Sequence, residues 1–191
     1  DGSNARMITN GEGRKQHLVF RYRNLDPDAR TISGAKPLLL STTNDDTKAT
    51  GYYRVNLAGT AAPEKIVMLD KQMGAPTKAK NADVLVFTES RFDEFPDLWV
   101  SDANFANAKK MSDANPQQSE FVWGKAENIK YINADGKVLT AMLIKPDNFD
   151  PTKKYPMMVY IYEELSQGLH GYRAPNVGTS VNLTRYVSNG Y

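Results

Sequence analysis

The sequence predicts a mainly β chain: the last antiparallel blades of a β-propeller, then the first strands and first helix of a truncated α/β domain. Three observations support this fold class. Residues 36–115 nearly repeat themselves, apolar and polar residues alternate within the repeat, and a later apolar run, Met157–Tyr162, shows no alternation. The first two features are typical of antiparallel sheets, and the third is typical of a strand buried on both faces.

The repeat has a period close to 45 residues. Leu39 and Leu85 lie 46 positions apart, and Val55 and Val100 lie 45 apart. Three short strands in such a period are typical of a β-propeller blade. An ordinary antiparallel meander with two coincidentally similar spacings is the alternative. The corresponding segments are Leu38–Thr42 with Leu85–Glu89, Gly51–Leu57 with Pro96–Asp102, and Glu64–Leu69 with Lys109–Ser112.

Local patterns place strands and turns within this region. Apolar and polar residues alternate strictly along Tyr53–Leu57, which predicts one buried and one solvated face. Asn44–Asp46 and Asn81–Asp83 supply turn residues at strand boundaries. His17–Tyr22 is predicted to be an outer strand of a preceding, incomplete blade.

A second region begins after the polar, Pro-containing linker Asn115–Ser119. Strands are predicted at Glu127–Ile132 and Val138–Ile144, joined by a hairpin turn with Asp-Gly at its tip. Pro146 ends the second strand because proline cannot donate to a ladder. We therefore divide the chain into residues 1–118, a partial propeller, and residues 119–191, the start of the α/β domain.

The remaining elements are a strand and a helix. Met157–Tyr162 is predicted to be a strand covered on both faces by helices. A helix is expected from about Thr179 to Ser188, with Asn189 and Gly190 as its C-terminal stop.

The composition excludes several functional classes. The 24 basic and 22 acidic residues are well mixed, so we expect neither a nucleic-acid nor a membrane partner. Without cysteine there is no disulfide, thiolate metal site or cysteine nucleophile, and two histidines argue against a histidine-rich metal site. We expect no cofactor. The absence of cysteine fits a periplasmic or secreted bacterial protein. The start at Asp1 instead of Met suggests either an internal cut or residues added for expression.

Several motifs occur together in a characteristic order. They are Glu89-Ser90, Phe95–Ser101, Asn115–Gln117, Trp123-Gly124, Asp135-Gly136, Lys145-Pro146 and Lys154–Tyr162. In this order the chain resembles the prolyl oligopeptidase family of serine peptidases, especially the bacterial dipeptidyl-peptidase-IV-like branch, over roughly residues 36–191. The resemblance implies a β-propeller joined to a C-terminal α/β-hydrolase domain with a Ser, Asp, His triad.

The triad itself is not expected within these residues. No Gly-x-Ser-x-Gly elbow occurs, and Ser166, Ser180 and Ser188 lack the pair of flanking glycines that such a turn requires. We therefore expect a fragment of a serine peptidase that hydrolyses short peptides by acyl transfer, and that is inactive alone. A non-catalytic β-propeller-type binding module is the alternative. In either case open sheet edges are expected to favour self-association of the fragment.

One catalytic role is implied by the resemblance. In the dipeptidyl-peptidase-like branch a tyrosine just after the buried strand donates its hydroxyl to the oxyanion, and the matching position is Tyr162. The family usually has small residues next, whereas Glu163 and Glu164 follow here. The alternative is that Tyr162 caps a strand, with its ring packed and its hydroxyl in water.

Structural roles explain the other candidate residues better than functional roles do. We expect His170 and His17 to be surface residues, Glu163-Glu164 to be a solvated pair rather than an amine site, and Trp99 and Trp123 to be packing anchors. Asp93-Glu94 and Asn44–Asp46 lack the loop of a calcium site, so solvated turns are the better interpretation. Asn182–Thr184 is a glycosylation sequon within the predicted helix.

Overall fold

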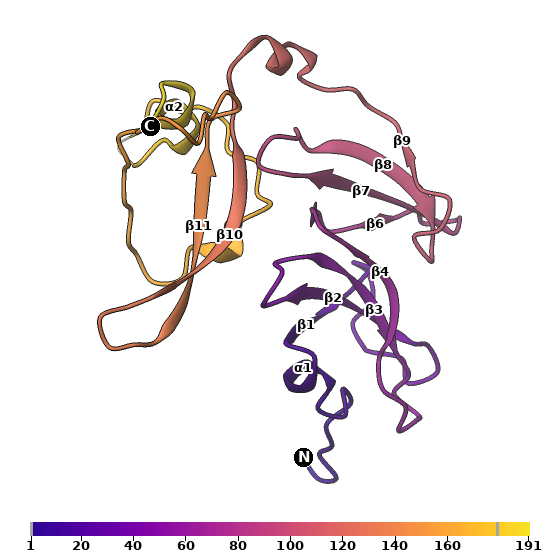
Figure 1. The fold of residues 1–191 in the computed structure, drawn as a ribbon. Helices are drawn as coiled ribbons and strands as arrows, with labels where there is room; N and C mark the ends of the chain where they lie inside the picture. Colours follow the sequence, from indigo (N-terminus) through magenta and orange to yellow (C-terminus); the bar gives the residue numbers. More distant parts are fainter. Residues whose placement is uncertain (1, 179) are drawn as a thin grey trace. The chain divides into compact units, whose positions relative to one another are not determined.

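A computed structural model describes residues 2–178 and 180–191. The chain forms two compact units, each discontinuous in sequence (Figure 1). The first unit comprises Asp1–Thr88 and Leu98–Met111, and the second comprises Glu89–Asp97 and Ser112–Tyr191. The predicted division after residue 118 remains a prediction. Most of the regular structure is antiparallel β, as the sequence predicts.

The first sheet is a four-stranded antiparallel meander in the order β1-β2-β3-β4. It consists of β1 (Leu18–Arg23), β2 (Leu38–Asn44), β3 (Thr50–Val55) and β4 (Glu64–Leu69), and the short helix α1 (Glu12–Lys15) precedes it. The predicted strands are confirmed. The assignment of His17–Tyr22 to a preceding blade is wrong, because β1 pairs along β2 from Leu18 opposite Asn44 to Arg23 opposite Leu39.

The second sheet repeats this pattern with shorter outer strands. Its order is β5-β7-β8-β9, with β6 also paired to β7. The strands are β5 (Gln72–Met73), β6 (Thr77–Lys78), β7 (Val84–Ser90), β8 (Asp97–Asp102) and β9 (Lys109–Lys110). The repeated segments therefore form equivalent strands, β2-β3-β4 and β7-β8-β9. Neither sheet closes into a barrel within the described residues, so the propeller itself stays a proposal.

Two apolar clusters hold the first unit together, and β3 contributes to both. Tyr53 and Val55 pack in one cluster with Leu18, Leu38 and Leu40. Tyr52 packs in the other with Met73, Leu85, Phe87 and Phe105, and its ring stacks on Phe105 with centroids 4.5 Å apart. The predicted alternation along Tyr53–Leu57 is confirmed, since Tyr53 and Val55 are buried whereas Arg54 and Asn56 are more exposed. Tyr52, just before this stretch, is buried in the second cluster, so both faces of β3 are covered at that point.

Alkaline pH is expected to destabilise this packing through Tyr52. Desolvation by burial raises the pKa of its phenol to about 12, although the nearby Arg23 charge opposes the shift. In the unfolded chain the pKa of this phenol is about 10, so the folded state binds the proton more tightly than the unfolded state does. This contribution to stability is fully present below pH ~10 and is lost as the pH rises towards about 12.

Urea unfolding at several pH values checks this expectation. The free energy of unfolding should fall between pH ~10 and ~12 in the native chain, and Tyr52→Phe should show a smaller fall because it has no proton to lose. An identical pH dependence in both proteins would contradict the assignment. The variant also loses the hydrogen bond from the Tyr52 hydroxyl to the carbonyl of Gly74 (2.8 Å), so only the pH dependence is compared.

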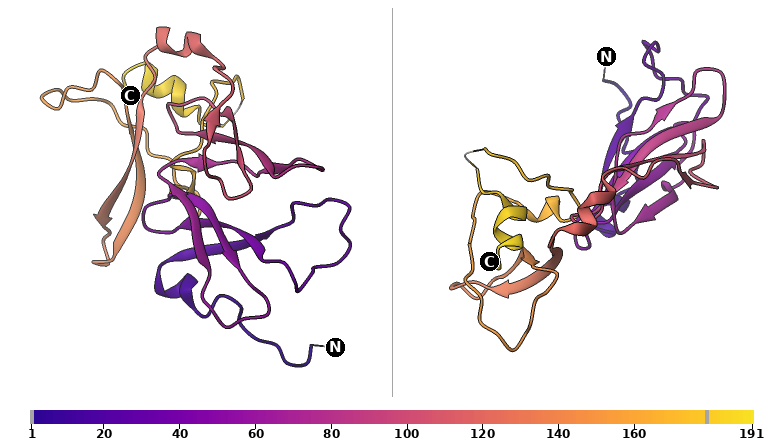
Figure 2. Two further views of the ribbon diagram at one scale, coloured as in Figure 1. Left: turned by 90° about the vertical axis from the view of Figure 1, so that its right-hand side faces the viewer. Right: turned by 90° about the horizontal axis from the view of Figure 1, so that it is seen from above.

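The second unit is built on a long hairpin (Figure 2). Strands β10 (Lys125–Ile132) and β11 (Val138–Lys145) pair antiparallel over eight residues each, as predicted. The turn is stabilised by Asn133, whose side-chain oxygen accepts from the amides of Asp135 and Lys137, and Gly136 adopts a φ of 75°. This conformation lies in the left-handed region that favours glycine.

Three short helical segments complete the unit. The predicted linker contains a 3₁₀ turn, η1 (Pro116–Glu120), and a second such turn, η2 (Ser166–Gly168), precedes α2 (Leu183–Ser188). The predicted helix thus begins later than expected, and Thr179 lies outside the described residues. Asn182 caps α2 by accepting from the Arg185 amide at 3.1 Å, and Gly190 ends it with a φ of 80°. No helix in residues 2–178 and 180–191 has the length and apolarity to cross a bilayer.

The predicted buried strand at Met157–Tyr162 is absent. These residues form neither helix nor strand, and their exposed fractions range from 48% at Met158 to 84% at Ile161. A strand exists only when another strand satisfies its N–H and C=O groups. In the described residues β10 and β11 pair only with each other, so no partner is present and the apolar side chains stay in solvent.

Candidate active-site region

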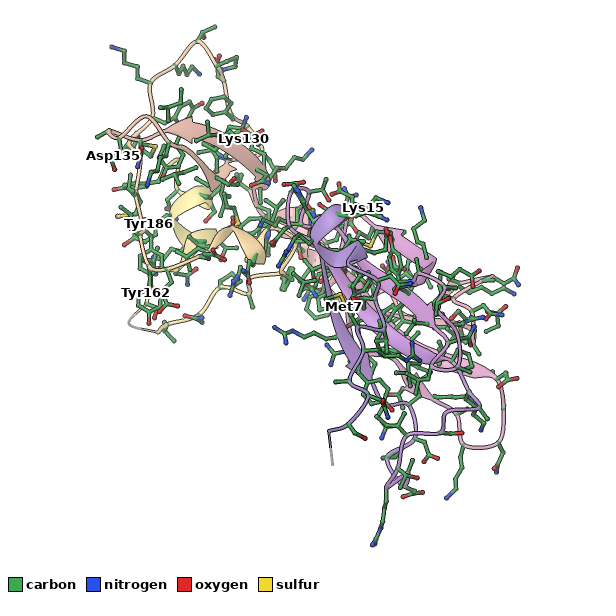
Figure 3. All side chains as sticks on the ribbon, turned by 90° about the horizontal axis from the view of Figure 1, so that it is seen from below. Met7, Lys15, Lys130, Asp135, Tyr162 and Tyr186 are labelled. Carbon is green, nitrogen blue, oxygen red and sulfur yellow. The ribbon has the colours of Figure 1, made fainter. Side chains whose placement is uncertain are left out.

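Tyr162, the residue matched to an oxyanion donor, lies at the outer margin of the second unit (Figure 3). Its side chain is 62% exposed, so the ring is not packed as the structural alternative requires. Glu163 follows with a φ of 41°, which turns the chain sharply. An oxyanion donor must be held rigidly in a site that excludes water. In this arrangement the Tyr162 hydroxyl is accessible to solvent, but it is not held rigidly in a site that excludes water.

The two glutamates after Tyr162 are exposed, as expected for a solvated pair. Glu164 accepts a hydrogen bond from the Gln167 side chain at 2.8 Å, a local contact at the start of η2. No cluster of three or more potential metal ligands occurs in the described parts of the chain.

The remaining acidic candidates and His17 lie in turns. Around Asp93-Glu94, the backbone groups of Arg91 and Glu94 exchange hydrogen bonds at 3.1 and 3.3 Å. Asn44 accepts hydrogen bonds from the amides of Asp46 and Thr47, at 2.9 and 2.8 Å. The carboxylate of Asp46 contacts His17 Nδ1 at 2.7 Å in an exposed pair. These contacts confirm the turn at Asn44–Asp46 and the surface position of His17.

His170 differs from its prediction. It is buried rather than on the surface, with an exposed fraction of 8%, and the neighbouring Leu169 is buried as well. The reason lies two residues further along the chain, where Tyr172 packs between two aromatic rings. Its ring stacks on Trp123 with centroids 5.4 Å apart and meets Phe95 edge-on at 5.1 Å. Anchoring Tyr172 in this cluster places the preceding residues inside the unit.

Trp123 is the centre of this aromatic cluster and confirms its prediction as a packing anchor. Its indole nitrogen donates to the carbonyl of Phe92 at 2.8 Å, and its amide donates to Asp147 at 3.0 Å. Asn115 donates to the Tyr172 hydroxyl at 3.1 Å. Burial raises the pKa of Tyr172, and this hydrogen bond partly opposes the rise. Trp99 is half-buried beside the second apolar cluster, as expected for a packing residue.

Asp97 is a structural residue that the sequence analysis missed. Its buried carboxylate accepts from the Ser112 hydroxyl at 2.7 Å and from the Ala114 amide at 2.8 Å. Together these bonds connect the residues just before the linker to Asp97, the first residue of β8, and both partners belong to the second unit. The available signal was an acidic residue directly before the apolar run Leu98–Val100, with Ser112 a short distance further along the chain. A buried carboxylate requires hydrogen-bond donors of this kind.

Removing the Asp97 carboxylate should destabilise the second unit. Charged hydrogen bonds contribute about 1.5–3 kcal/mol, so Asp97→Ala should lower the free energy of unfolding by about 2–3 kcal/mol in urea titrations. Asp97→Asn is the matched control, because it retains one acceptor oxygen and should cost less. Equal losses in the two variants would show that the carboxylate is not the group that fastens the linker.

The sequon is unsuited to glycosylation in this fold. The Asn182 side chain caps α2 and donates to the Asn176 carbonyl, while Thr184 is almost fully buried. A modification enzyme would require both side chains to be accessible.

Comparisons with known proteins point to peptidases. No family model matches the chain. Over 33 residues it is 54% identical to probable dipeptidyl-aminopeptidase B from three strains of Ajellomyces capsulatus, a match that covers 17% of this chain and 4% of the relative.

Two solved structures share its fold. The isopeptidase AtxE2, as a variant with Astexin3-dC4 bound, matches with a TM-score of 0.60 and 14% identity, covering 92% of this chain and 30% of that one. Its apo form matches with a TM-score of 0.58 and 15% identity, over 82% and 23% of the two chains. The chain thus spans less than a third of these structures. It resembles part of an isopeptidase in fold and a dipeptidyl-aminopeptidase in one short sequence segment.

Proposed function

We propose that this chain is a segment of a serine peptidase of the prolyl oligopeptidase type, comprising propeller blades and the start of the α/β-hydrolase domain. The observation that carries the proposal is the 54% identity to dipeptidyl-aminopeptidase B over 33 residues. The fold similarity to an isopeptidase over 92% of the chain supports it independently. The two successive antiparallel sheets, of four and five strands, are also consistent with neighbouring blades.

In this proposal the longer protein cleaves short peptides by acyl transfer. A serine, histidine and aspartate from outside these 191 residues would form the triad, since the chain has no Gly-x-Ser-x-Gly elbow. Tyr162 would help stabilise the oxyanion once further strands paired with Met157–Tyr162. Pairing would bury the apolar side chains of this segment and hold the phenolic hydroxyl in one position, which the exposed loop does not.

Peptidase assays on two proteins test the proposal. The 191-residue chain should not hydrolyse chromogenic dipeptide substrates, whereas the longer protein encoded by the same gene should do so and be inactivated by a serine-directed phosphonate. If the longer protein has no serine elbow, or binds peptides without cleaving them, it is a binding module instead. Phosphonate-sensitive turnover by the 191-residue chain would contradict the missing triad.

A further inference from the structure

The chain contains two Asn-Gly pairs, Asn10-Gly11 and Asn189-Gly190. In such a pair the glycine nitrogen can attack the side-chain carbonyl carbon of the asparagine, because glycine has no side chain to hinder the approach. Both asparagines are exposed and both glycines are half-buried. The glycines also share a left-handed conformation, with φ of 76° and 80°. Sequence and exposure therefore do not distinguish the two sites, and any difference in their reactivity must come from their hydrogen bonds.

The two asparagine side chains are held in the same way. The Asn10 side-chain nitrogen donates to the backbone carbonyl of Thr60. The Asn189 side-chain nitrogen donates to the backbone carbonyl of Arg185 at 2.7 Å. In each case one backbone carbonyl accepts from the amide that would be lost, so the group under attack is similarly restrained at both sites.

The attacking nitrogens differ. The Gly190 N–H donates to the carbonyl of Val187 at 3.1 Å, as part of the turn that ends α2. The Gly11 N–H donates to no acceptor within residues 2–178 and 180–191. A hydrogen-bonded amide must break its bond before it can lose its proton and turn towards the asparagine. The nitrogen of Gly11 is therefore the more available nucleophile.

We propose that Asn10 is a site of spontaneous deamidation, and that the reaction releases the N-terminal segment Arg6–Lys15 from the first sheet. The Gly11 nitrogen gives its proton to base and bonds to Asn10 Cγ. The Cγ–Nδ2 bond breaks, and the departing nitrogen takes a proton from water and leaves as ammonia. Water then opens the cyclic imide at either carbonyl carbon, which yields aspartate or isoaspartate. Neither an oxidant nor a cofactor is consumed, and the proposal is independent of peptidase activity in a longer protein.

Release follows from the contacts that hold this segment. It is tied to the loop between β3 and β4 at two points, by the bond from Asn10 to the Thr60 carbonyl and by the bond from the Arg6 guanidinium to the Gly59 carbonyl at 3.0 Å. Between them Ile8 packs against the first apolar cluster. Deamidation replaces the donor of Asn10 with a carboxylate that faces a carbonyl oxygen. Two acceptors cannot bond, so the segment keeps one of its two ties.

Peptide mapping of the aged chain tests the reaction. After incubation of the folded chain in warm, mildly alkaline buffer, mass spectrometry should show Asn10 converted at least about fivefold faster than Asn189, the advantage that one hydrogen bond at the attacking nitrogen gives. In concentrated urea the two rates should converge, because unfolding removes this bond and leaves the Asn-Gly sequences unchanged.

Three results of this experiment would overturn the proposal. One is an Asn189 that reacts as fast as Asn10 in the folded chain. Another is a rate difference that persists undiminished in urea, which would assign it to local sequence and not to the fold. The third is an Asn10 that stays intact in the folded chain over the time in which both pairs react in urea.

Hydrogen exchange tests the release. Asn10→Asp has the product's charge without the reaction, and the amides of Arg6–Lys15 should exchange about two- to tenfold faster than in the native chain, the effect of losing one hydrogen bond. Asn4→Asp is the matched control. It makes the same change at an exposed residue of the same terminus whose side chain makes no hydrogen bond in the described chain, and it should leave the exchange unchanged. Native exchange rates in Asn10→Asp, or equal acceleration in both variants, would contradict the release.

Discussion

Trp123→Ala should strongly destabilise the second unit. The side chain is buried, stacks on Tyr172 and donates to the Phe92 carbonyl, so its removal leaves both a cavity and an unpaired acceptor. Truncating a buried tryptophan costs about 3–5 kcal/mol. Urea unfolding followed by far-UV circular dichroism should show this loss, with the transition of the second unit moving to lower denaturant.

Two further variants separate the contribution of the cavity from that of the unpaired acceptor. Trp123→Phe retains a ring against Tyr172 but not the N–H donor, so it should cost about 1–3 kcal/mol, the penalty for an unsatisfied buried group. Trp99→Ala is the matched control in the first unit. Trp99 is only half-buried, and its ring lies 6.0 Å from the Lys71 ammonium, so its truncation should cost less than that of Trp123. Equal losses for the two alanine variants would remove the special role assigned to the aromatic cluster.

Tyr162→Phe should lower the kcat of the longer peptidase by about 10²–10³ if the hydroxyl stabilises the oxyanion. KM should change little, because the hydroxyl would act on charge that develops only in the transition state. Steady-state kinetics on a chromogenic dipeptide gives both values. The substitution removes one exposed oxygen and keeps the ring, so the fold should be unaffected.

Tyr160→Phe is the control for this experiment. It makes the same chemical change two residues away in the same exposed segment, and it should leave kcat unchanged. If both variants lower kcat equally, the effect belongs to the segment as a whole and not to a hydroxyl at the oxyanion. If Tyr162→Phe retains full activity, the assignment of Tyr162 is wrong while the peptidase proposal survives.

Local sequence patterns accounted for much of the secondary structure. The strands of the repeat and the β10–β11 hairpin form where alternation, turn residues and the Asp-Gly tip predict them. These signals act between residues close in sequence, and a hairpin register is fixed by its turn. The helix stop at Asn189-Gly190 is likewise a local feature.

The predictions that failed concern long-range packing. The sequence alone identified Trp123 as an anchor but could not show that Tyr172 stacks on it and carries His170 into the interior, because the two rings lie far apart in the chain. Nor could it show that β1 belongs to the first sheet.

The sequence by itself determined that this is a chain of short antiparallel strands without thiol chemistry or a serine elbow. Only the tertiary structure decided the environment of the apolar run Met157–Tyr162, which is exposed and unpaired. The apolar composition of a segment indicates how much free energy it would gain from burial. Burial itself requires neighbouring strands and helices, and these are absent around Met157–Tyr162 in the described chain.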